Sequence, residues 1–247
     1  MRTRPLLIFC IGVMMSGLST AAPKIVLKLD DFQASKGFCP CLPTMDYLIQ
    51  RQIKAGYGAV ANKFDSTAIG ILQPYLNATN HKGEKLVEVW HHGLDHKRPE
   101  FAGTSYEYQK AHFDQANQLI KKYLGIQMYT FGTPYNASDS ITNRVVSEDT
   151  NYKVFMYSSV LPVITSGIMY MDHRVNMENG TGNPEFDYFV VNYNKLKNSY
   201  TDYITLQGHP NQWTPVKLEQ FKKIIDLLIS EGCEFVLPFE FYKSRIK

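Results

Sequence analysis

The sequence predicts a single α/β domain built on a parallel sheet or barrel. Short apolar runs alternate with longer amphipathic segments along most of the chain, a pattern typical of repeated strand–helix units. The chain has 247 residues, and barrels of this type commonly take about 250 residues as one domain. With 44% hydrophobic and 20% charged residues, the composition supports a sizeable core and excludes a disordered chain.

Each expected strand is a short apolar run, and each expected helix carries apolar residues at three- and four-residue spacing. The expected strands span residues 24–29, 57–62, 86–91, 127–131, 153–157, 186–191, 203–207 and 234–238. The expected helices span residues 42–55, 66–76, 105–124, 139–147, 193–200 and 215–230. Residues 158–182 are the least regular part of the chain.

Residues 1–21 read as a secretory signal peptide. Arg2 and Arg4 precede an apolar run over residues 5–15, and small residues with a Ser19-x-Ala21 pattern follow it. The run is shorter than the roughly 20 residues of a membrane span. We therefore expect a secreted or periplasmic protein with a mature domain over residues 22–247 and no stable membrane span after cleavage. An uncleaved anchor is the alternative.

The charge of the mature chain is close to zero. The formal net charge is +3, from 26 basic and 23 acidic side chains. Removing the two arginines of the signal leaves 24 basic against 23 acidic side chains, a net charge of +1. A nucleic acid is therefore not an expected partner, and the sequence leaves the oligomeric state open.

The mature chain keeps three cysteines, Cys39, Cys41 and Cys233. They are either small buried side chains, or Cys233 forms a disulfide with one of the other two. A cysteine-based zinc site would need more ligands than this pattern offers.

Acidic residues and histidines follow three of the expected strands. Asp30 and Asp31 end the first strand, His92 and His96 follow the third, and His209 follows the strand over residues 203–207. In parallel folds the carboxyl ends of the strands carry the functional residues. Each feature alone has an ordinary structural explanation, but their joint placement predicts a site.

The chemistry of these residue types indicates a metal site. Asp31, His92 and His96 supply one carboxylate and two imidazoles, which hold a divalent ion and leave a fourth position open to water. Zinc would lower the pKa of that water to about 7. The two imidazoles lie one helical turn apart if the loop after the strand turns helically. Asp30, alternating to the other side of the strand end, is then free to act as a base.

These motifs resemble those of the polysaccharide deacetylases with a NodB-homology domain, over residues 25–238. The resemblance implies a distorted (β/α) barrel of seven or eight strands. The four matching segments are Leu29-Asp30-Asp31-Phe32, His91-His92-Gly93-Leu94-Asp95-His96, Phe131-Gly132-Thr133-Pro134-Tyr135 and Leu206-Gln207-Gly208-His209.

The resemblance also implies roles for these residues. Asp31, His92 and His96 would bind the metal, with zinc expected first and cobalt, nickel or manganese as alternatives. Asp30 would take a proton from the attacking water, and His209 would protonate the leaving group. The backbone N–H of Tyr135 would stabilise the oxyanion.

The substrate that the resemblance implies is an acetylated glycan that loses an N- or O-acetyl group. Trp213, four residues after His209, is the aromatic residue that we expect to stack on a sugar ring. Arg98 and Pro134 complete the predicted substrate-binding residues.

Two departures from the family pattern indicate a divergent branch. Gly132 stands where the third motif usually has an arginine that pairs with the base, and Arg98 or Arg174 is expected to replace it. No clear motif supports the acid, for which Asp172 and Asp187 are the candidates. The alternatives are an esterase or amidase of the same fold acting on another acylated substrate, and a catalytically weakened glycan-binding protein.

Overall fold

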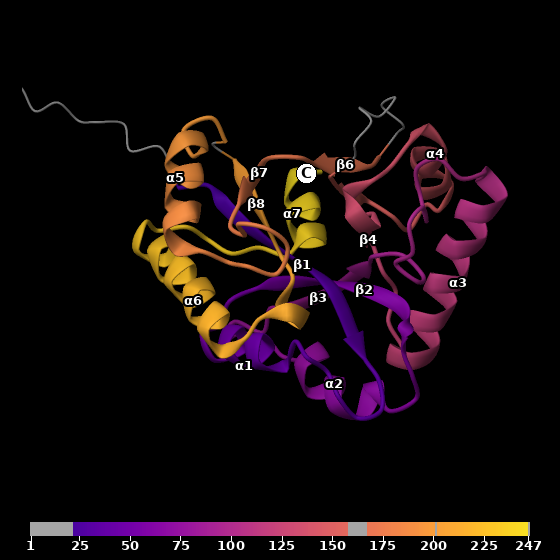
Figure 1. Ribbon diagram of the computed structural model, residues 1–247, viewed down its shortest axis with the longest axis horizontal. Helices are drawn as coiled ribbons and strands as arrows, with labels where there is room; N and C mark the ends of the chain where they lie inside the picture. The colour runs from indigo at the N-terminus through magenta and orange to yellow at the C-terminus, as the bar shows by residue number, and fades with distance from the viewer. Residues whose placement is uncertain (1–21, 158–166, 201, 247) are drawn as a thin grey trace, which may run out of the picture.

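Eight parallel strands form one curled sheet in the computed structural model, which describes residues 22–157, 167–200 and 202–246. The strand order is β6-β5-β4-β3-β2-β1-β8-β7. Helices cover the outside of the sheet, with α5 and α6 on one flank and α3 and α4 on the other (Figure 1). The predicted (β/α) barrel is confirmed, while the predicted signal peptide lies outside the described residues.

Strands and helices alternate from β1 to β5 as the apolar pattern predicts, but the described strands β6 and β7 and the helix α7 were not among the expected elements. The strands are β1 Lys24–Ala34, β2 Ala55–Phe64, β3 Val87–His91, β4 Thr130–Phe131, β5 Val154–Met156, β6 Met169–Met171, β7 Arg174–Asn176 and β8 Tyr203–Gly208. The helices are α1 Leu42–Gln50, α2 Ala68–Leu76, α3 Tyr106–Leu124, α4 Ser140–Glu148, α5 Phe186–Leu196, α6 Pro215–Ser230 and α7 Pro238–Arg245. Two short 3₁₀ turns, η1 Pro134–Asn136 and η2 Pro210–Gln212, follow β4 and β8.

Two predictions near the C-terminal half are wrong. Residues 186–191 were expected to form a strand, but they begin the helix α5, which buries Phe189 and Tyr193 four residues apart. Aromatic and β-branched residues favour strands, and here the helical spacing of the apolar residues prevails. Residues 234–238 contribute a single bridge, from Phe235 to Ile25, before α7 starts at Pro238.

Strand β1 separates the two layers of the core. Ile25, Leu27 and Leu29 belong to the large cluster between sheet and helices, whereas Val26 packs with Trp90 inside the barrel. Since side chains alternate across a strand, Lys28 and Asp30 also point inward.

Trp90 on β3 fills the centre of the barrel. Its ring occupies the space that side chains on β2 would take: a Cβ at Gly58 would overlap the indole, and one at Gly56 would lie 3.2 Å from it. A Cβ at Gly132 would lie 2.9 Å from the same ring. The glycines at positions 56, 58 and 132 therefore leave the room that the Trp90 ring needs inside the barrel.

Residues of α7 and of the first half of β3 line a cavity of about 460 Å³. Glu88 lines this cavity and accepts hydrogen bonds from Thr130 Oγ1 at 2.5 Å and from the Phe239 N–H at 3.0 Å. Burial raises the pKa of Glu88 to about 7.

Glu88→Gln should make the protein more stable at pH 8 by up to about 3 kcal/mol, with less effect at pH 5. The unfolded carboxyl ionises near pH 4.5 and the folded one only near pH 7, so wild-type stability falls as the pH rises between these values. Denaturant unfolding of both proteins at pH 5 and pH 8 measures the difference. A difference in stability that is the same at both pH values would contradict the prediction.

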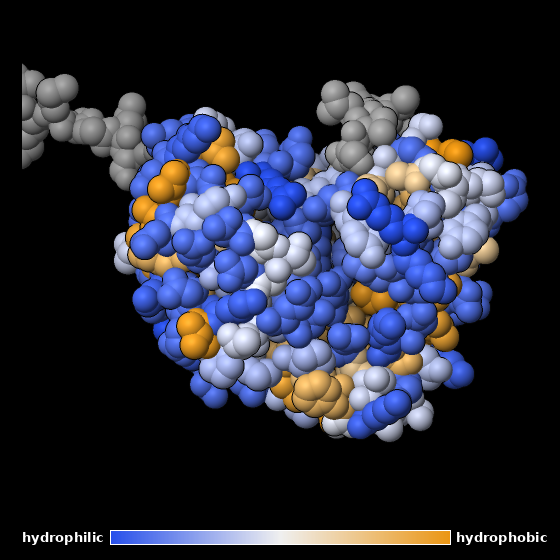
Figure 2. Space-filling model, in the orientation of Figure 1, coloured by the Kyte–Doolittle hydropathy of each residue, from blue (hydrophilic) through white to orange (hydrophobic). Residues whose placement is uncertain are grey.

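Hydrophilic residues cover most of the face seen in Figure 2, and the apolar residues on it lie in small separate groups. Within the described ranges, none of the helices is long and apolar enough to cross a membrane.

Cys39, Cys41 and Cys233 are free and buried, so the disulfide considered from the sequence is absent.

Candidate metal and catalytic site

Strand β1 continues past Asp30 and Asp31 to Ala34, and it brings both carboxylates to the same place. Asp31 has a positive φ of 58°, and the pairing of β1 with β2 shifts register after Leu29. As a result, Asp30 Oδ2 and Asp31 Oδ1 lie 3.6 Å and 3.5 Å from His92 Nε2. The expected alternation to opposite sides is wrong, because the left-handed residue interrupts the strand period. Such backbone strain is common at functional sites.

The loop that carries the two histidines does not turn helically. Gly93 and His96 have positive φ values of 86° and 57°, and the chain bends between them. The buried carboxylate of Glu100 accepts hydrogen bonds from the backbone N–H of Leu94 and, at 2.9 Å, from that of His96. The histidines are brought together by this buried anchor, and not by the helical turn that their spacing suggested.

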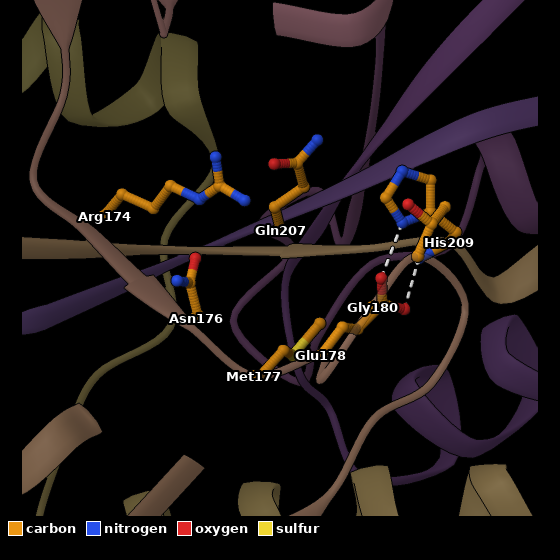
Figure 3. Close-up of a pocket in the computed structure, with 8 residues that line it drawn as sticks. Arg174, Asn176, Met177, Glu178, Gly180, Gln207 and His209 are labelled. Carbon is orange, nitrogen blue, oxygen red and sulfur yellow. Dashed lines mark hydrogen bonds and ion pairs between the residues drawn. The ribbon is translucent and has the colours of Figure 1, made fainter. Parts of the chain in front are cut away.

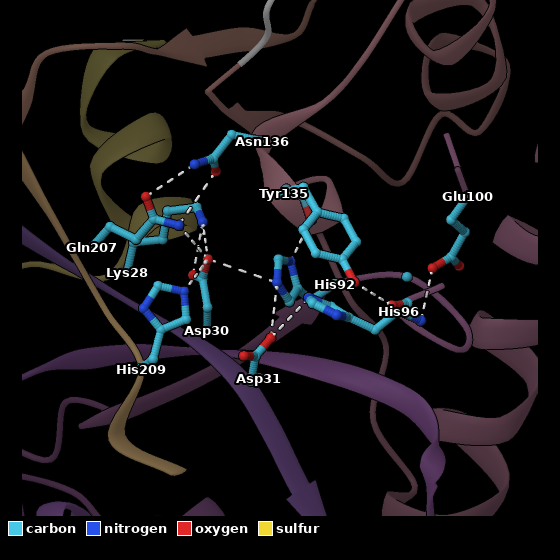
Figure 4. Close-up of polar contacts among 12 residues, drawn as sticks. Lys28, Asp30, Asp31, His92, His96, Glu100, Tyr135, Asn136, Gln207 and His209 are labelled. Carbon is cyan, nitrogen blue, oxygen red and sulfur yellow. Dashed lines mark hydrogen bonds and ion pairs between the residues drawn. The ribbon is translucent and has the colours of Figure 1, made fainter. Parts of the chain in front are cut away.

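Asp31, His92 and His96 form a compact set of possible metal ligands (Figure 4). Asp31 Oδ1 lies 3.0 Å from His96 Nε2 and 3.5 Å from His92 Nε2. Ligand atoms around a tetrahedral ion with bonds of about 2.1 Å are separated by about 3.4 Å. Both separations from Asp31 are therefore close to those expected between ligands of such an ion.

Two further observations fit a divalent ion. His92 Nδ1 donates a hydrogen bond to the Gly132 carbonyl at 2.7 Å, which leaves the lone pair on Nε2, facing Asp31. Asp31 Oδ1 is buried yet makes no hydrogen bond of good geometry within the described structure. Burial alone would raise the pKa of Asp31, but His92 and His96 hold it well below its usual range, so the carboxylate is ionised.

Asp30 has a cationic partner that the sequence analysis did not identify. Lys28 Nζ donates to Asp30 Oδ1 at 2.7 Å and to Oδ2 at 2.6 Å, and both side chains are almost fully buried. Gln207, paired with Lys28 across β1 and β8, donates from Nε2 to Asp30 Oδ2 at 2.6 Å. Burial alone would raise the pKa of Asp30, but Lys28 and the neighbouring histidines hold it below its usual range.

The two arginines expected beside Asp30 line the same cavity but are not its hydrogen-bond partners, which are Lys28 and Gln207. The Arg98 guanidinium stands 5.4 Å from the centre of the Tyr135 ring, and that of Arg174 stands 5.1 Å from the Tyr157 ring. The sequence held a signal for the true partner, since Lys28 and Asp30 are two apart on one strand and so share a face.

His209, directly after β8, is oriented by Glu178. Its Nδ1 donates to Glu178 Oε2 at 2.6 Å, and its backbone N–H donates to Oε1 at 2.9 Å (Figure 3). Its Nε2 lies 3.9 Å from Asp30 Oδ2. Burial alone would lower the pKa of His209, but Glu178 and Asp30 outweigh it and raise that pKa.

The supporting carboxylate is therefore neither Asp172 nor Asp187. Asp172 contacts the Tyr203 hydroxyl, and Asp187 lies in the first turn of α5. The sequence did not predict Glu178, because the stretch over residues 158–182 has no apolar periodicity from which its position could be inferred.

Trp213 supports the same carboxylate. Its Nε1 donates to Glu178 Oε1 at 2.8 Å, and its ring packs against Phe221 with centres 4.6 Å apart. Through these contacts the indole helps to hold Glu178 in place, and its stacking on a sugar stays a prediction.

A cavity of about 430 Å³ joins these groups. Tyr135, exposed at the tip of η1 with a φ of 59°, donates its hydroxyl proton to the His96 carbonyl at 2.8 Å. Pro134 is buried beneath it and lines a smaller neighbouring cavity together with Arg98. The larger cavity is lined by Asp30, Asp31, His92, His96, Arg98, Tyr135, Asn136, Arg174, Thr181, Gln207, His209 and Gln212.

Several solved structures share this fold. One is the Xyl-CE4 domain of a multidomain xylanase from the hindgut metagenome of Trinervitermes trinervoides (TM-score 0.65, 19% identity, covering 90% of this chain and 91% of that chain). Another is a family 4 acetyl xylan esterase from Clostridium thermocellum in complex with a cobalt ion (TM-score 0.64, 18% identity, 90% and 91%). A third is a CE4 family pseudoenzyme from Bacillus anthracis (TM-score 0.58, 14% identity, 90% and 66%).

These likenesses establish the fold as that of CE4 polysaccharide deacetylases. The low identities agree with a divergent branch of that fold. No family model matches the sequence, and no curated protein matches it.

Proposed function

We propose that this chain is a metal-dependent hydrolase that removes acetyl groups from a glycan outside the cytoplasm. One observation carries the proposal: a candidate ligand triad, a buried carboxylate and an oriented histidine meet at one cavity. The metal is expected to be zinc, with cobalt, nickel or manganese as alternatives. The acetyl xylan esterase that shares the fold was solved with cobalt, which supports a metal-dependent reaction.

Asp31, His92 and His96 would hold the ion. When bound, a divalent cation polarises the acyl carbonyl and makes water a better nucleophile at neutral pH. Asp30, fixed by Lys28 and Gln207, accepts the proton of the attacking water.

His209 would act on the leaving group. Its Nδ1 is committed to Glu178, so Nε2 is the atom that delivers a proton from the cavity side. The backbone N–H of Tyr135 is proposed to stabilise the oxyanion, and Arg98 and Pro134 to shape the place of the sugar beside it.

The alternative of a weakened glycan-binding protein had one argument, the missing arginine at Gly132. The same fold does include a pseudoenzyme. In this chain, however, Lys28 supplies a cation to the carboxylate that the arginine would have served, and this favours an active enzyme.

Acetate release tests the proposal. The purified chain, loaded with zinc, is assayed on acetylated chito-oligosaccharides, acetyl-xylan and an aryl acetate. Release from the first indicates amide hydrolysis, and release from the second indicates ester hydrolysis. Metal bound to the chain with no acetate from any of the three would instead favour the binding protein.

Glu178→Gln should move the alkaline limb of the kcat/KM profile to lower pH. A neutral amide stabilises the imidazolium less than a carboxylate does, so His209 would lose its proton at lower pH. The raised pKa of His209 in the wild type keeps it protonated to higher pH, and activity is lost as the pH rises through that value. An unchanged alkaline limb, measured on acetyl-xylan, would remove Glu178 from this role.

A further inference from the structure

We propose that Lys28 is a positioning residue that fixes the carboxylate of Asp30 for proton transfer and replaces the missing cation at position 132. The inference rests on the proposed function and goes beyond it, because it assigns a task to a residue outside all the recognised motifs.

The contact between the two side chains is close and complete. Lys28 Nζ bridges both carboxylate oxygens, and Gln207 Nε2 adds a third hydrogen bond to Oδ2. Lys28 has no exposed surface, and Asp30 is 1% exposed, so no solvent competes for these bonds. Three hydrogen bonds from two side chains on neighbouring strands thus fix both the position and the plane of the carboxylate (Figure 4).

Position 132 lies beside Lys28 and Trp90 inside the barrel. A Cβ at Gly132 would lie 3.4 Å from Lys28 Cε and 2.9 Å from the Trp90 ring. A side chain at position 132 would therefore collide with the indole, while its Cβ would be in ordinary van der Waals contact with Lys28. Glycine at position 132 leaves room for the indole, and the cation beside Asp30 comes from Lys28 instead.

The remaining surroundings of Lys28 are aromatic. Its Nζ lies 4.9 Å from the Trp90 ring centre and 5.0 Å from that of Tyr157, distances typical of cation–π contacts. These rings hold the ammonium in place but do not replace a counter-ion. Since an apolar side chain would usually fill a buried position at less cost than an ion pair, the lysine is best explained by what it does for Asp30.

A purely structural role makes a different prediction from a positioning role. If Lys28 only fills the barrel, methionine at this position should preserve turnover. If it positions Asp30, the loss should fall on kcat and leave KM and metal content unchanged, because neither the ligand triad nor the outer cavity includes Lys28. Misplacing a reacting group by about 1 Å can cost roughly a hundredfold in rate.

The test compares Lys28→Met, Lys28→Arg and Lys28→Ala with the wild type on acetyl-xylan and acetylated chito-oligosaccharides. We expect Lys28→Met to lower kcat by about a hundredfold or more, with KM within about twofold and metal content unchanged. Lys28→Arg should retain more activity than Lys28→Met. Propylammonium added to Lys28→Ala should restore activity in a saturable way, because it returns an ammonium to the vacated space.

The matched control is Lys54→Met. Lys54 is also a buried lysine in an ion pair, 2.6 Å from Glu240 and 2.9 Å from Glu84, but it lies away from the site. It should leave kcat unchanged. Wild-type kcat in Lys28→Met, or a loss that accompanies lost metal and that propylammonium does not restore, would overturn the proposal.

A second measurement does not depend on activity. In denaturant unfolding, the double variant Lys28→Met/Asp30→Asn should be more stable than either single variant, because each single change leaves one buried charge unpaired. If the stability losses of the two single variants simply add up in the double variant, Lys28 and Asp30 do not stabilise the fold as a pair. If the wild type releases no acetate from any substrate, the proposed function fails, while this cycle still decides whether Lys28 and Asp30 act as a pair.

Discussion

Replacing Asp30 with asparagine should lower kcat by about 10² to 10⁴-fold while the chain still binds one metal ion. The carboxylate is the proposed acceptor of the water proton, and losing a general base costs about this much. The candidate ligands Asp31, His92 and His96 are untouched, and asparagine has nearly the same shape as aspartate. Steady-state kinetics on acetyl-xylan, with metal analysis of the same samples, measures both quantities.

Asp226→Asn is the matched control for that experiment. Asp226 also pairs with a cation, 2.9 Å from Arg51 Nη2, but the pair is exposed on the outside of the barrel. It should change neither activity nor metal content. Full activity in Asp30→Asn would show that another group takes the proton.

The second large effect is expected from His96→Ala, which should reduce bound metal from about one ion to nearly none and abolish acetate release. Two ligands, Asp31 and His92, would remain, and they do not close a site for a divalent ion. Added zinc should raise the melting temperature of the wild type, since a ligand that binds only the folded state stabilises it, but not that of the variant. Metal analysis and thermal unfolding with and without zinc check both.

His112→Ala separates this site from a neighbouring cluster. His112, Asp95 and Glu100 also lie within reach of one another, but both Glu100 oxygens already accept backbone hydrogen bonds from the histidine loop. We expect this variant to keep its metal. If His112→Ala loses the ion and His96→Ala keeps it, the ion binds at the cluster of Asp95, Glu100 and His112, and our assignment is wrong.

The fold and the main groups of the site could be predicted because both depend on local pattern. Apolar runs of strand length place Asp30, Asp31, His92 and His209 at strand ends, and the carboxyl ends of parallel strands meet at one edge. The structure brings these residues together around one cavity. Their roles as base, ligands and acid remain predictions.

What the sequence did not reveal depends on backbone geometry and on long-range contacts. The two-residue period of a strand predicts Asp30 and Asp31 on opposite faces. The positive φ of Asp31 interrupts this period and brings both carboxylates to the same side. The same period places Lys28 on the face of Asp30. The sequence prediction nevertheless took Arg98 or Arg174 as the cation that replaces the arginine missing at position 132. Glu178 reaches His209 from an irregular segment, for which neither propensity nor periodicity gives a position.

Titration of the chelated wild-type chain with zinc, followed by acetate release from acetyl-xylan and acetylated chito-oligosaccharides, tests the proposed function most directly. We expect no release without metal, a rise that saturates at one ion per chain, and no rise in His96→Ala at the same zinc concentrations. Activity that is indifferent to chelation, or a zinc response that His96→Ala shares with the wild type, would contradict a metal-dependent deacetylase at this site.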